Sequence, residues 1–312
     1  EKKLISYCFL TAINIPQDFS IEQDKLGCIE GYEFTFVDPY PEKFGRTSSL
    51  EAATYRKVII KLDAYSPDIA LNKAYKFLLT KLAIWSLLYT KCIFSFENNK
   101  SLNVFGLGGM HTLHSASDGK MLRKYVELNY ISRPKWSIQF EGVSDSILSK
   151  SYHIEQNLHK LKYSKKVIDT LCSYIIAANE FNHMNLLREL WTAIEVLNKK
   201  EKPRTIPKKD IGTRENGEEA NSAKSAISRC CKSIGRDEKL LLNSARIIRN
   251  ISTHNTYKSD YAKYICQELC SVFLDVLIYH SDVDRDTNFD DALPKVEQVF
   301  KGKKNQVVVI SL

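Results

Sequence analysis

The sequence predicts an α+β protein in which a mixed N-terminal half precedes an all-helical C-terminal half. Up to about residue 150, short runs rich in β-branched and aromatic residues recur, which is typical of strands. Beyond that point, apolar residues recur at helical spacing through long segments. With 312 residues, 44% of them hydrophobic, the chain is long enough for two cores and too apolar for general disorder. We therefore expect a mixed α/β domain over 1–150 and a helical bundle over 151–312.

The N-terminal half contains five candidate strands and one strong helix. Ala70, Ala74, Leu78 and Trp85 recur at helical spacing and predict a helix over Pro67–Tyr89. Its apolar run is interrupted by Lys81 and is shorter than the 18 to 20 residues or so that a membrane span needs, so we expect a buried helix and no membrane association. The opening segment EKKLISYCFLTAIN continues into the polar stretch NIPQD, and we expect it to be a strand rather than a secretory signal. The candidate strands are 4–13, 32–38, 55–64, 92–97 and 136–143.

Two motif-like stretches are expected to carry no cofactor or metal. VFGLGGMHTLH lacks the third glycine of a dinucleotide fingerprint, so a flexible loop is predicted there. His111 and His114 have no cysteine or acidic partner at metal spacing. DVDRDTNFDD has neither the glycine nor the final glutamate of a calcium loop.

The C-terminal half reads as helices joined by mostly short connections, which favours an antiparallel bundle. Residues 198–222 are the exception: this charged stretch holds two prolines and two glycines and is predicted to be a mobile loop. Lys199, Lys200, Lys208 and Lys209 within it could contact phosphates, or the loop could simply be solvated. The expected helices are 153–180, 183–200, 222–235, 237–253 and 260–280, followed by a strand at 305–312.

The net charge and the cysteine content indicate which partners and which cellular compartment are compatible with the sequence. The net charge of +8 and the pI of about 8.9 are compatible with a nucleic-acid partner without requiring one. The eight cysteines include no CxxC pair and suggest no disulfide framework, so we expect buried reduced thiols in a cytoplasmic protein.

The stretch RIIRNISTHN, residues 246–255, combines basic, amide and imidazole groups at the end of a predicted helix. Spacings of three and four residues put Asn243, Arg246, Asn250 and His254 on one stripe, which Arg249 borders. Leu240, Ile247, Ile248 and Ile251 are predicted to face the core from the opposite side. Cations near a helix C-terminus complement the helix dipole, which accounts for Arg249 but not for the whole stripe.

These residues resemble a known family motif. Arg249-Asn250-Ile251-Ser252-Thr253-His254 looks like the RNxxxH motif of HEPN-domain ribonucleases, and the preceding LLRELWTAIEVLNKK resembles a helix common in their Apea-like branch. The resemblance covers about residues 155–285. It implies a HEPN-type bundle with metal-independent endoribonuclease activity, assembled by dimerisation, often behind an α/β sensor or regulatory domain in bacterial antiphage defence.

The residue types suit this chemistry. Cleavage by the ribose 2′-hydroxyl needs a group that moves protons near neutral pH, and histidine can serve, so His254 is the candidate general acid/base. An arginine fork matches the developing phosphorane charge, which makes Arg249 the candidate phosphate clamp. Asn250 would orient the histidine or the scissile phosphate. Because one histidine cannot readily hold both proton-transfer roles, a symmetric homodimer is expected.

Further residues are weaker candidates. Glu195 either pairs with Arg246 or Arg249, fixing the guanidinium, or points to water at the bundle edge. Trp191 is expected in the core rather than as a base-stacking platform. Tyr257 could stack on a base.

The expected substrate is single-stranded or loop RNA, for example a tRNA anticodon arm, because its bases are the most accessible to side chains. The expected setting is antiphage defence or a toxin system, with a phage-derived activator or regulatory partner acting on the N-terminal domain. Two alternatives stay open: a non-catalytic HEPN bundle that binds RNA or nucleotides, and a helical adaptor protein.

Overall fold

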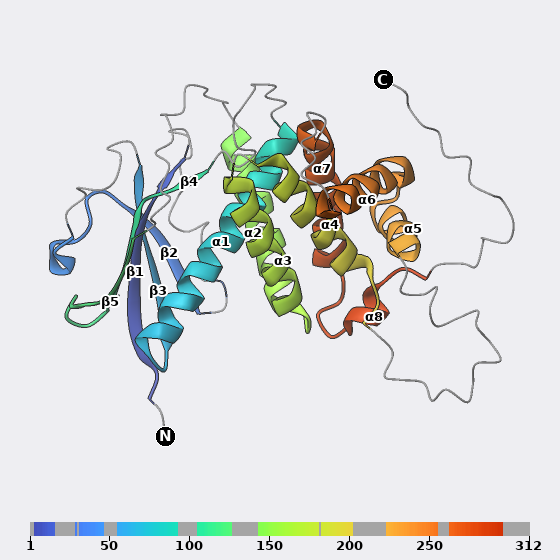
Figure 1. The fold of residues 1–312 in the computed structure, drawn as a ribbon. Coiled ribbons are helices and arrows are strands. Elements are labelled where there is room, and N and C mark those ends of the chain that lie inside the picture. Colours follow the sequence, from blue (N-terminus) through green and yellow to red (C-terminus); the bar gives the residue numbers. More distant parts are fainter. Residues whose placement is uncertain are drawn as a thin grey trace, which may run out of the picture.

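The protein is α+β: an antiparallel sheet carries one long helix, and the remaining helices pack together behind that helix (Figure 1). The computed structural model describes residues 3–15, 29, 31–46, 55–92, 105–126, 143–180, 182–201, 223–254 and 262–295. Side chains are described within these ranges except at 91–92, 143–145 and 252–254.

The sheet has the strand order β2-β3-β1-β5-β6, and β4 also pairs with β1. Its strands are β1 (Ile5–Asn14), β2 (Tyr32–Val37), β3 (Arg56–Ala64), β4 (Gly106–Leu107), β5 (Met110–Ser115) and β6 (Met121–Val126). The long β1 is central and almost wholly buried because both of its faces are covered, which explains its nearly continuous apolar run. Phe9 and Ile13 join the main core, whereas Cys8 and Leu10 pack on the other face against Tyr40 and Phe44.

Helix α1 (Pro67–Cys92) lies between the sheet and the other helices (Figure 1). Its 26 residues make it about 39 Å long at 1.5 Å per residue. Its N-terminal part packs on β3 and β6, and the helix also contacts α2 (Val143–Lys160), α3 (Ser164–Asn179) and α7 (Ala262–Ser281). Both sides of α1 are therefore buried. This fits its sequence, in which apolar residues occur around most of the helix rather than on one face.

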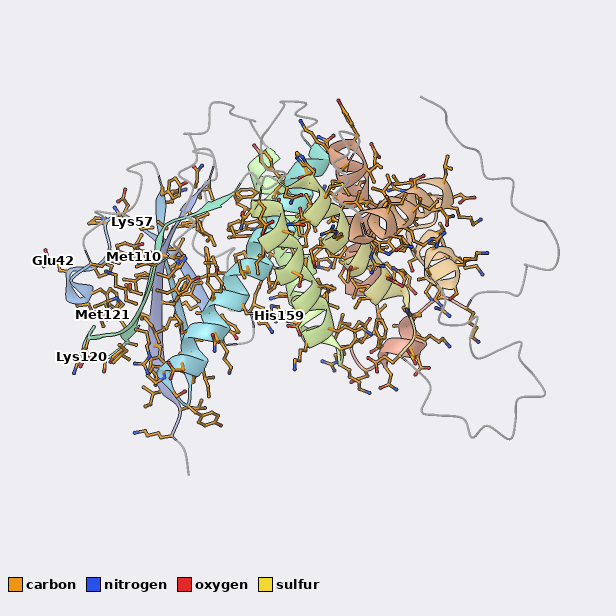
Figure 2. The ribbon with its side chains drawn as sticks, viewed as in Figure 1. Glu42, Lys57, Met110, Lys120, Met121 and His159 are labelled. Carbon is orange, nitrogen blue, oxygen red and sulfur yellow. The ribbon has the colours of Figure 1, made fainter. Side chains whose placement is uncertain are left out.

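One hydrophobic core runs from the sheet through α1 into the bundle. Phe9 of the sheet, Trp85 of α1 and Trp191 of α4 (His183–Asn198) all belong to it. Figure 2 shows side chains filling the space on both sides of α1; His159 of α2, labelled there, lies against Phe77 of α1 with ring centroids 6.3 Å apart. The sequence composition changes near residue 150, where the domain boundary was expected. Helix α1, however, packs against the helices of the C-terminal half as well as against the sheet.

The bundle is completed by α5 (Ala223–Ile234), α6 (Lys239–His254) and a short α8 (Phe289–Ala292). Helix α4 is its centre, since it packs on α3, α5, α6 and α7. Trp191 is 1% exposed, so its predicted place in the core is confirmed. None of the helices in the described part of the chain is long and apolar enough to cross a membrane.

The elements predicted at 4–13, 32–38, 55–64 and 67–89 are confirmed as β1, β2, β3 and α1, and those at 183–200, 222–235, 237–253 and 260–280 as α4 to α7. The pattern over 153–180 proves to be the end of α2 and the whole of α3, separated by a turn at 161–163. The candidate strands at 92–97 and 136–143 each overlap the described residues at one end only, where Cys92 belongs to α1 and Val143 to α2. Their remaining residues, the candidate strand at 305–312 and residues 202–222 of the charged stretch lie outside the described residues. The six cysteines whose side chains are described are free and buried, as expected: Cys8, Cys172, Cys230, Cys231, Cys266 and Cys270.

The predicted flexible loop around the glycines is wrong. Most of this stretch forms β4 and β5, and its polar side chains are buried with hydrogen-bond partners. His111 Nδ1 lies 2.7 Å from Thr11 Oγ1, and His114 contacts the Gly119 carbonyl oxygen and Thr112 Oγ1 at 2.8 and 2.9 Å. Because they are three apart on a strand, the two histidines face opposite sides of the sheet.

Candidate functional site

Helix α6 presents its buried and exposed faces differently from the prediction. Leu242 and Ala245 are buried, and Leu241 and Ile248 pack on the core from the edge of this face. The predicted core residues Leu240, Ile247 and Ile251 are instead 77%, 47% and 44% exposed. Only Ile248 of the predicted apolar side packs inward. The sequence LLLNSARII has apolar residues on nearly every side, so the neighbouring helices decide the face, and small Ala245 lies at its centre.

The polar stripe is nevertheless assembled on α6 as the spacing predicted, as far as its side chains are described. Arg246 and Arg249 are half-buried, and Asn250 is exposed. Being three residues apart, the two arginines are neighbours on the helix surface. Asn243, one turn before Arg246, donates from its amide nitrogen to the Lys239 carbonyl oxygen at 2.9 Å.

Arg249 and Asn250 are coupled directly. Arg249 Nη1 donates to Asn250 Oδ1 at 3.1 Å. Since the amide oxygen accepts this bond, the amide NH₂ group of Asn250 is turned to act as a donor. A donor beside a guanidinium suits an anionic oxygen better than a cation.

Arg246 is the most informative residue of the site. Its Nε atom is buried and makes no hydrogen bond to any residue that the structure describes. Arg236, by contrast, is paired with Glu238 and Asp275, both at 3.0 Å. No acidic residue occurs in α6, so Arg246 and Arg249 have no carboxylate on their own helix. Two neighbouring guanidinium groups repel each other, and a bound anion would relieve that repulsion.

His254 is the last residue of α6, and its side chain is not among those described. The helix places its backbone one turn beyond Asn250, in line with the stripe. Tyr257, Lys208 and Lys209 lie outside the described residues altogether.

Glu195 pairs with neither arginine in the interactions that the structure describes. Its carboxylate lies 3.4 Å from Lys199 Nζ, one turn further along α4, and is 17% exposed. Lys199 is thereby partly neutralised, while Lys200 is exposed. Arg188, which the sequence analysis did not single out, lies seven residues before Glu195 and thus on the same face of α4. The seven-residue spacing of Arg188 and Glu195 within LLRELWTAIE would have predicted that both lie on the same face of the helix.

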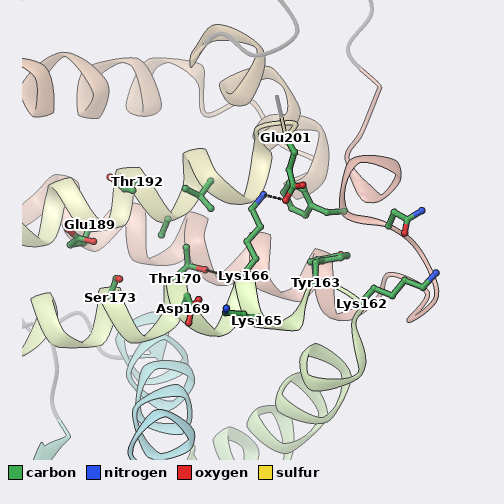
Figure 3. Close-up of a pocket in the computed structure, with 14 residues that line it drawn as sticks. Lys162, Tyr163, Lys165, Lys166, Asp169, Thr170, Ser173, Glu189, Thr192 and Glu201 are labelled. Carbon is green, nitrogen blue, oxygen red and sulfur yellow. Dashed lines mark hydrogen bonds and ion pairs between the residues drawn. The ribbon is translucent and has the colours of Figure 1, made fainter. Parts of the chain in front are cut away.

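A separate groove of about 770 Å³ lies between α3 and α4 (Figure 3). None of the predicted site residues lines it. Lys166 is paired with Glu201 at 3.3 Å, and Asp169 is paired with Lys76 of α1. The lining carries equal numbers of lysines and acidic residues, so it does not favour a polyanion. Its charged residues are Lys162, Lys165, Lys166, Asp169, Glu189 and Glu201.

Buried histidines outside the stripe are held neutral. Burial, with a smaller contribution from Arg46, lowers the pKa of His111 to about 4. Burial also lowers the pKa of His280 to about 4, against the opposing effect of its hydrogen bond to the Leu197 carbonyl oxygen. His280 also lies 3.0 Å from the Tyr163 hydroxyl, so it ties α7 to the end of α4 and to the start of α3.

No group of three or more histidine, cysteine, aspartate or glutamate side chains within the described ranges is placed to hold a metal ion. Comparisons of the chain with protein-family models, curated proteins and solved structures found no match. The resemblance to HEPN ribonucleases therefore depends on the motif residues themselves.

Proposed function

We propose that the chain is a metal-independent endoribonuclease that cuts single-stranded or loop RNA by attack of the ribose 2′-hydroxyl on the adjacent phosphorus. The observation that carries the proposal is the arginine pair on α6. Arg246 has a buried Nε atom without a hydrogen bond to the described residues, and Arg249 holds Asn250 in a donor orientation. This arrangement fits a phosphodiester, whose oxygens accept several hydrogen bonds and carry the compensating charge.

In this reaction the 2′-oxygen forms a bond to phosphorus while the bond to the 5′-oxygen of the next nucleotide breaks. His254 takes up or supplies the proton, as an imidazole can near neutral pH. Arg249 and Arg246 stabilise the charge on the non-bridging oxygens. Asn250 donates to the phosphate or to the imidazole. The products are a 2′,3′-cyclic phosphate and a free 5′-hydroxyl.

A single imidazole serves one proton transfer at a time, so we include a homodimer in the proposal, with the second copy supplying the other group. We further propose that the sheet and α1 form a regulatory region in an antiphage or toxin system, responding to a phage-derived activator or another partner. Because α1 is part of the common core, removing residues 1–150 would expose buried helices. Surface substitutions on the sheet are the better probe of regulation.

The proposal is tested by incubating purified protein with total RNA in EDTA. The wild type should cleave, and His254→Ala and Arg249→Ala should each lose at least a hundredfold in rate. Lys150→Ala, at an exposed lysine of α2 outside the proposed regulatory region, is the matched control and should cleave like the wild type. A mobility shift without cleavage would support the RNA-binding alternative. The absence of both a mobility shift and cleavage would support the adaptor alternative.

A further inference from the structure

Strand β6 forms one edge of the sheet, and among the described residues it pairs only with β5. Its side chains are exposed or half-buried throughout, and Met121, Tyr125 and Val126 are 54%, 47% and 41% exposed. The other edge strand, β2, carries none of the exposed large apolar side chains, and its Tyr32 stacks on Phe77 of α1 with ring centroids 4.5 Å apart. An open edge with exposed apolar side chains is a template for another strand.

The two faces of β6 differ in chemistry. Residues directly opposite each other on paired strands share a face of the sheet. Tyr125 is opposite His111 and stacks on its ring with centroids 5.8 Å apart, and it lies 6.1 Å from the ring of Tyr75 of α1. Lys124 is opposite Thr112 and therefore projects from the other face, away from α1. A strand added to this edge would meet aromatic rings on one face and a lysine on the other.

The charge at this edge is positive. Arg123 is paired with Asp68 of α1 at 2.7 Å. Lys120 and Lys124 are exposed, and neither forms an ion pair with a residue that the structure describes. Strand β6 itself contains no acidic residue. Figure 2 shows Lys120 and Met121 at the side of the molecule away from the helices. The edge therefore attracts negatively charged groups.

We propose that β6 is a docking site for an extended segment of a protein partner in which apolar and acidic residues alternate. The segment adds to the sheet as a further strand. Its backbone pairs with β6, its apolar side chains pack beside Tyr125, and its carboxylates lie beside Lys124. Binding at this edge requires nothing of the proposed nuclease. The further step, that this partner is the one that regulates the nuclease, rests on the proposed function.

The charges favour an acidic partner over a second copy of this chain. Two β6 strands side by side would gather the cations of both copies at one seam, and like charges on neighbouring strands destabilise pairing. Lysines on edge strands prevent such self-pairing in natural sheets. A strand that carries carboxylates turns the same repulsion into attraction. Lys124 thus acts as a selectivity element that rejects self-pairing and admits an acidic segment.

The test measures binding of labelled peptides to the full-length protein by fluorescence anisotropy at low salt, where charge is least screened. The probe is an eight-residue peptide that alternates valine and glutamate, and its counterpart has lysine in place of glutamate. The wild type should bind the acidic peptide at least tenfold more tightly than the basic one. Lys124→Glu should remove this preference. Lys150→Glu, at an exposed lysine of α2, makes the same change in net charge and should retain it.

Pairing through the backbone is tested with N-methylated versions of the acidic peptide. Successive N–H groups of an extended strand point to opposite edges, and a docked strand uses only one of these edges. Methylating the valines blocks one edge, and methylating the glutamates blocks the other. One of the two patterns should weaken binding at least tenfold, and the other should leave it within about twofold.

Equal affinity for the acidic and basic peptides would overturn the charge assignment, and equal effects of Lys124→Glu and Lys150→Glu would overturn the site. Equal effects of the two methylation patterns would overturn strand addition. A dimer of the free protein that the acidic peptide dissociates would make a second copy the occupant of this edge. None of these measurements involves RNA cleavage, so the docking site and the nuclease proposal can fail independently of each other.

Discussion

Substitution of Lys81 by methionine is expected to destabilise the protein by ~3–5 kcal/mol, because it leaves a carboxylate buried without its cation. Lys81 Nζ of α1 lies 2.5 Å from Glu155 Oε2 of α2, and the two side chains are 2% and 1% exposed. Ser151 Oγ donates to the other carboxylate oxygen at 2.9 Å. The pair thus joins the long helix of the N-terminal half to the first helix of the bundle.

The aromatic surroundings add to the ammonium's stabilisation. Lys81 Nζ lies 5.2 Å from the ring centroid of Phe34, 5.3 Å from that of Phe77 and 5.5 Å from that of Trp85. Desolvated cation–π contacts contribute up to about 2 kcal/mol. The rings cannot help the carboxylate, so loss of the lysine should cost more than loss of the glutamate.

Replacing both members by methionine removes both desolvation penalties while keeping similar volume. The double variant should therefore lie within about 1 kcal/mol of the wild type or be more stable. Urea unfolding of the wild type, both single variants and the double variant gives the coupling free energy directly. Additive single costs would show that the two charges do not compensate each other, which would refute this reasoning.

Three further predictions concern the bundle. Since burial lowers the pKa of His280 to about 4, the unfolded state binds more protons at this position between pH 6.5 and 4, so His280 should contribute roughly 3 kcal/mol to the loss of stability as the pH falls through this range. Urea unfolding of His280→Gln should show a correspondingly smaller fall, and an unchanged pH dependence would contradict the assignment. Trp191→Ala should cost ~3–5 kcal/mol in the same assay because the side chain is 1% exposed; a loss below about 1 kcal/mol would mean that the core is misassigned. Glu195→Gln should change stability by less than about 1 kcal/mol, since Lys199 is its described partner, and should leave the RNA cleavage rate within about twofold. A much larger loss of activity would place Glu195 in the site after all.

The positions of most helices in the C-terminal half could be predicted because their apolar residues recur at regular helical spacing and polar segments separate them. The orientation of α6 was not, because Leu240, Leu241 and Leu242 offer three competing faces. Contacts with α4, α5 and α7 choose the face that contains Leu242 and Ala245. Such a choice depends on partners that the local pattern does not contain.

The missed strand β5 shows the same limit. Its histidines and threonine look unlike a buried strand, but they find hydrogen-bond partners: His114 locally, at Thr112 and Gly119, and His111 far along the chain. Thr11, which meets His111, is 100 positions away in sequence. Glu195 was expected to pair with Arg246 or Arg249 or to face water, whereas its described partner is Lys199, four residues further along the same helix. The stripe on α6 was easier to predict, because its members are local and helix geometry alone brings them together.

The most direct test of the proposed chemistry concerns the nucleophile. Once a cleavage site in a defined RNA has been mapped, a single 2′-deoxy substitution at the nucleotide on its 5′ side removes the attacking hydroxyl and nothing else. The account predicts that cutting at that phosphate stops, while neighbouring sites are still cut and still yield 2′,3′-cyclic phosphate ends in EDTA. Continued cleavage at the substituted position would contradict it.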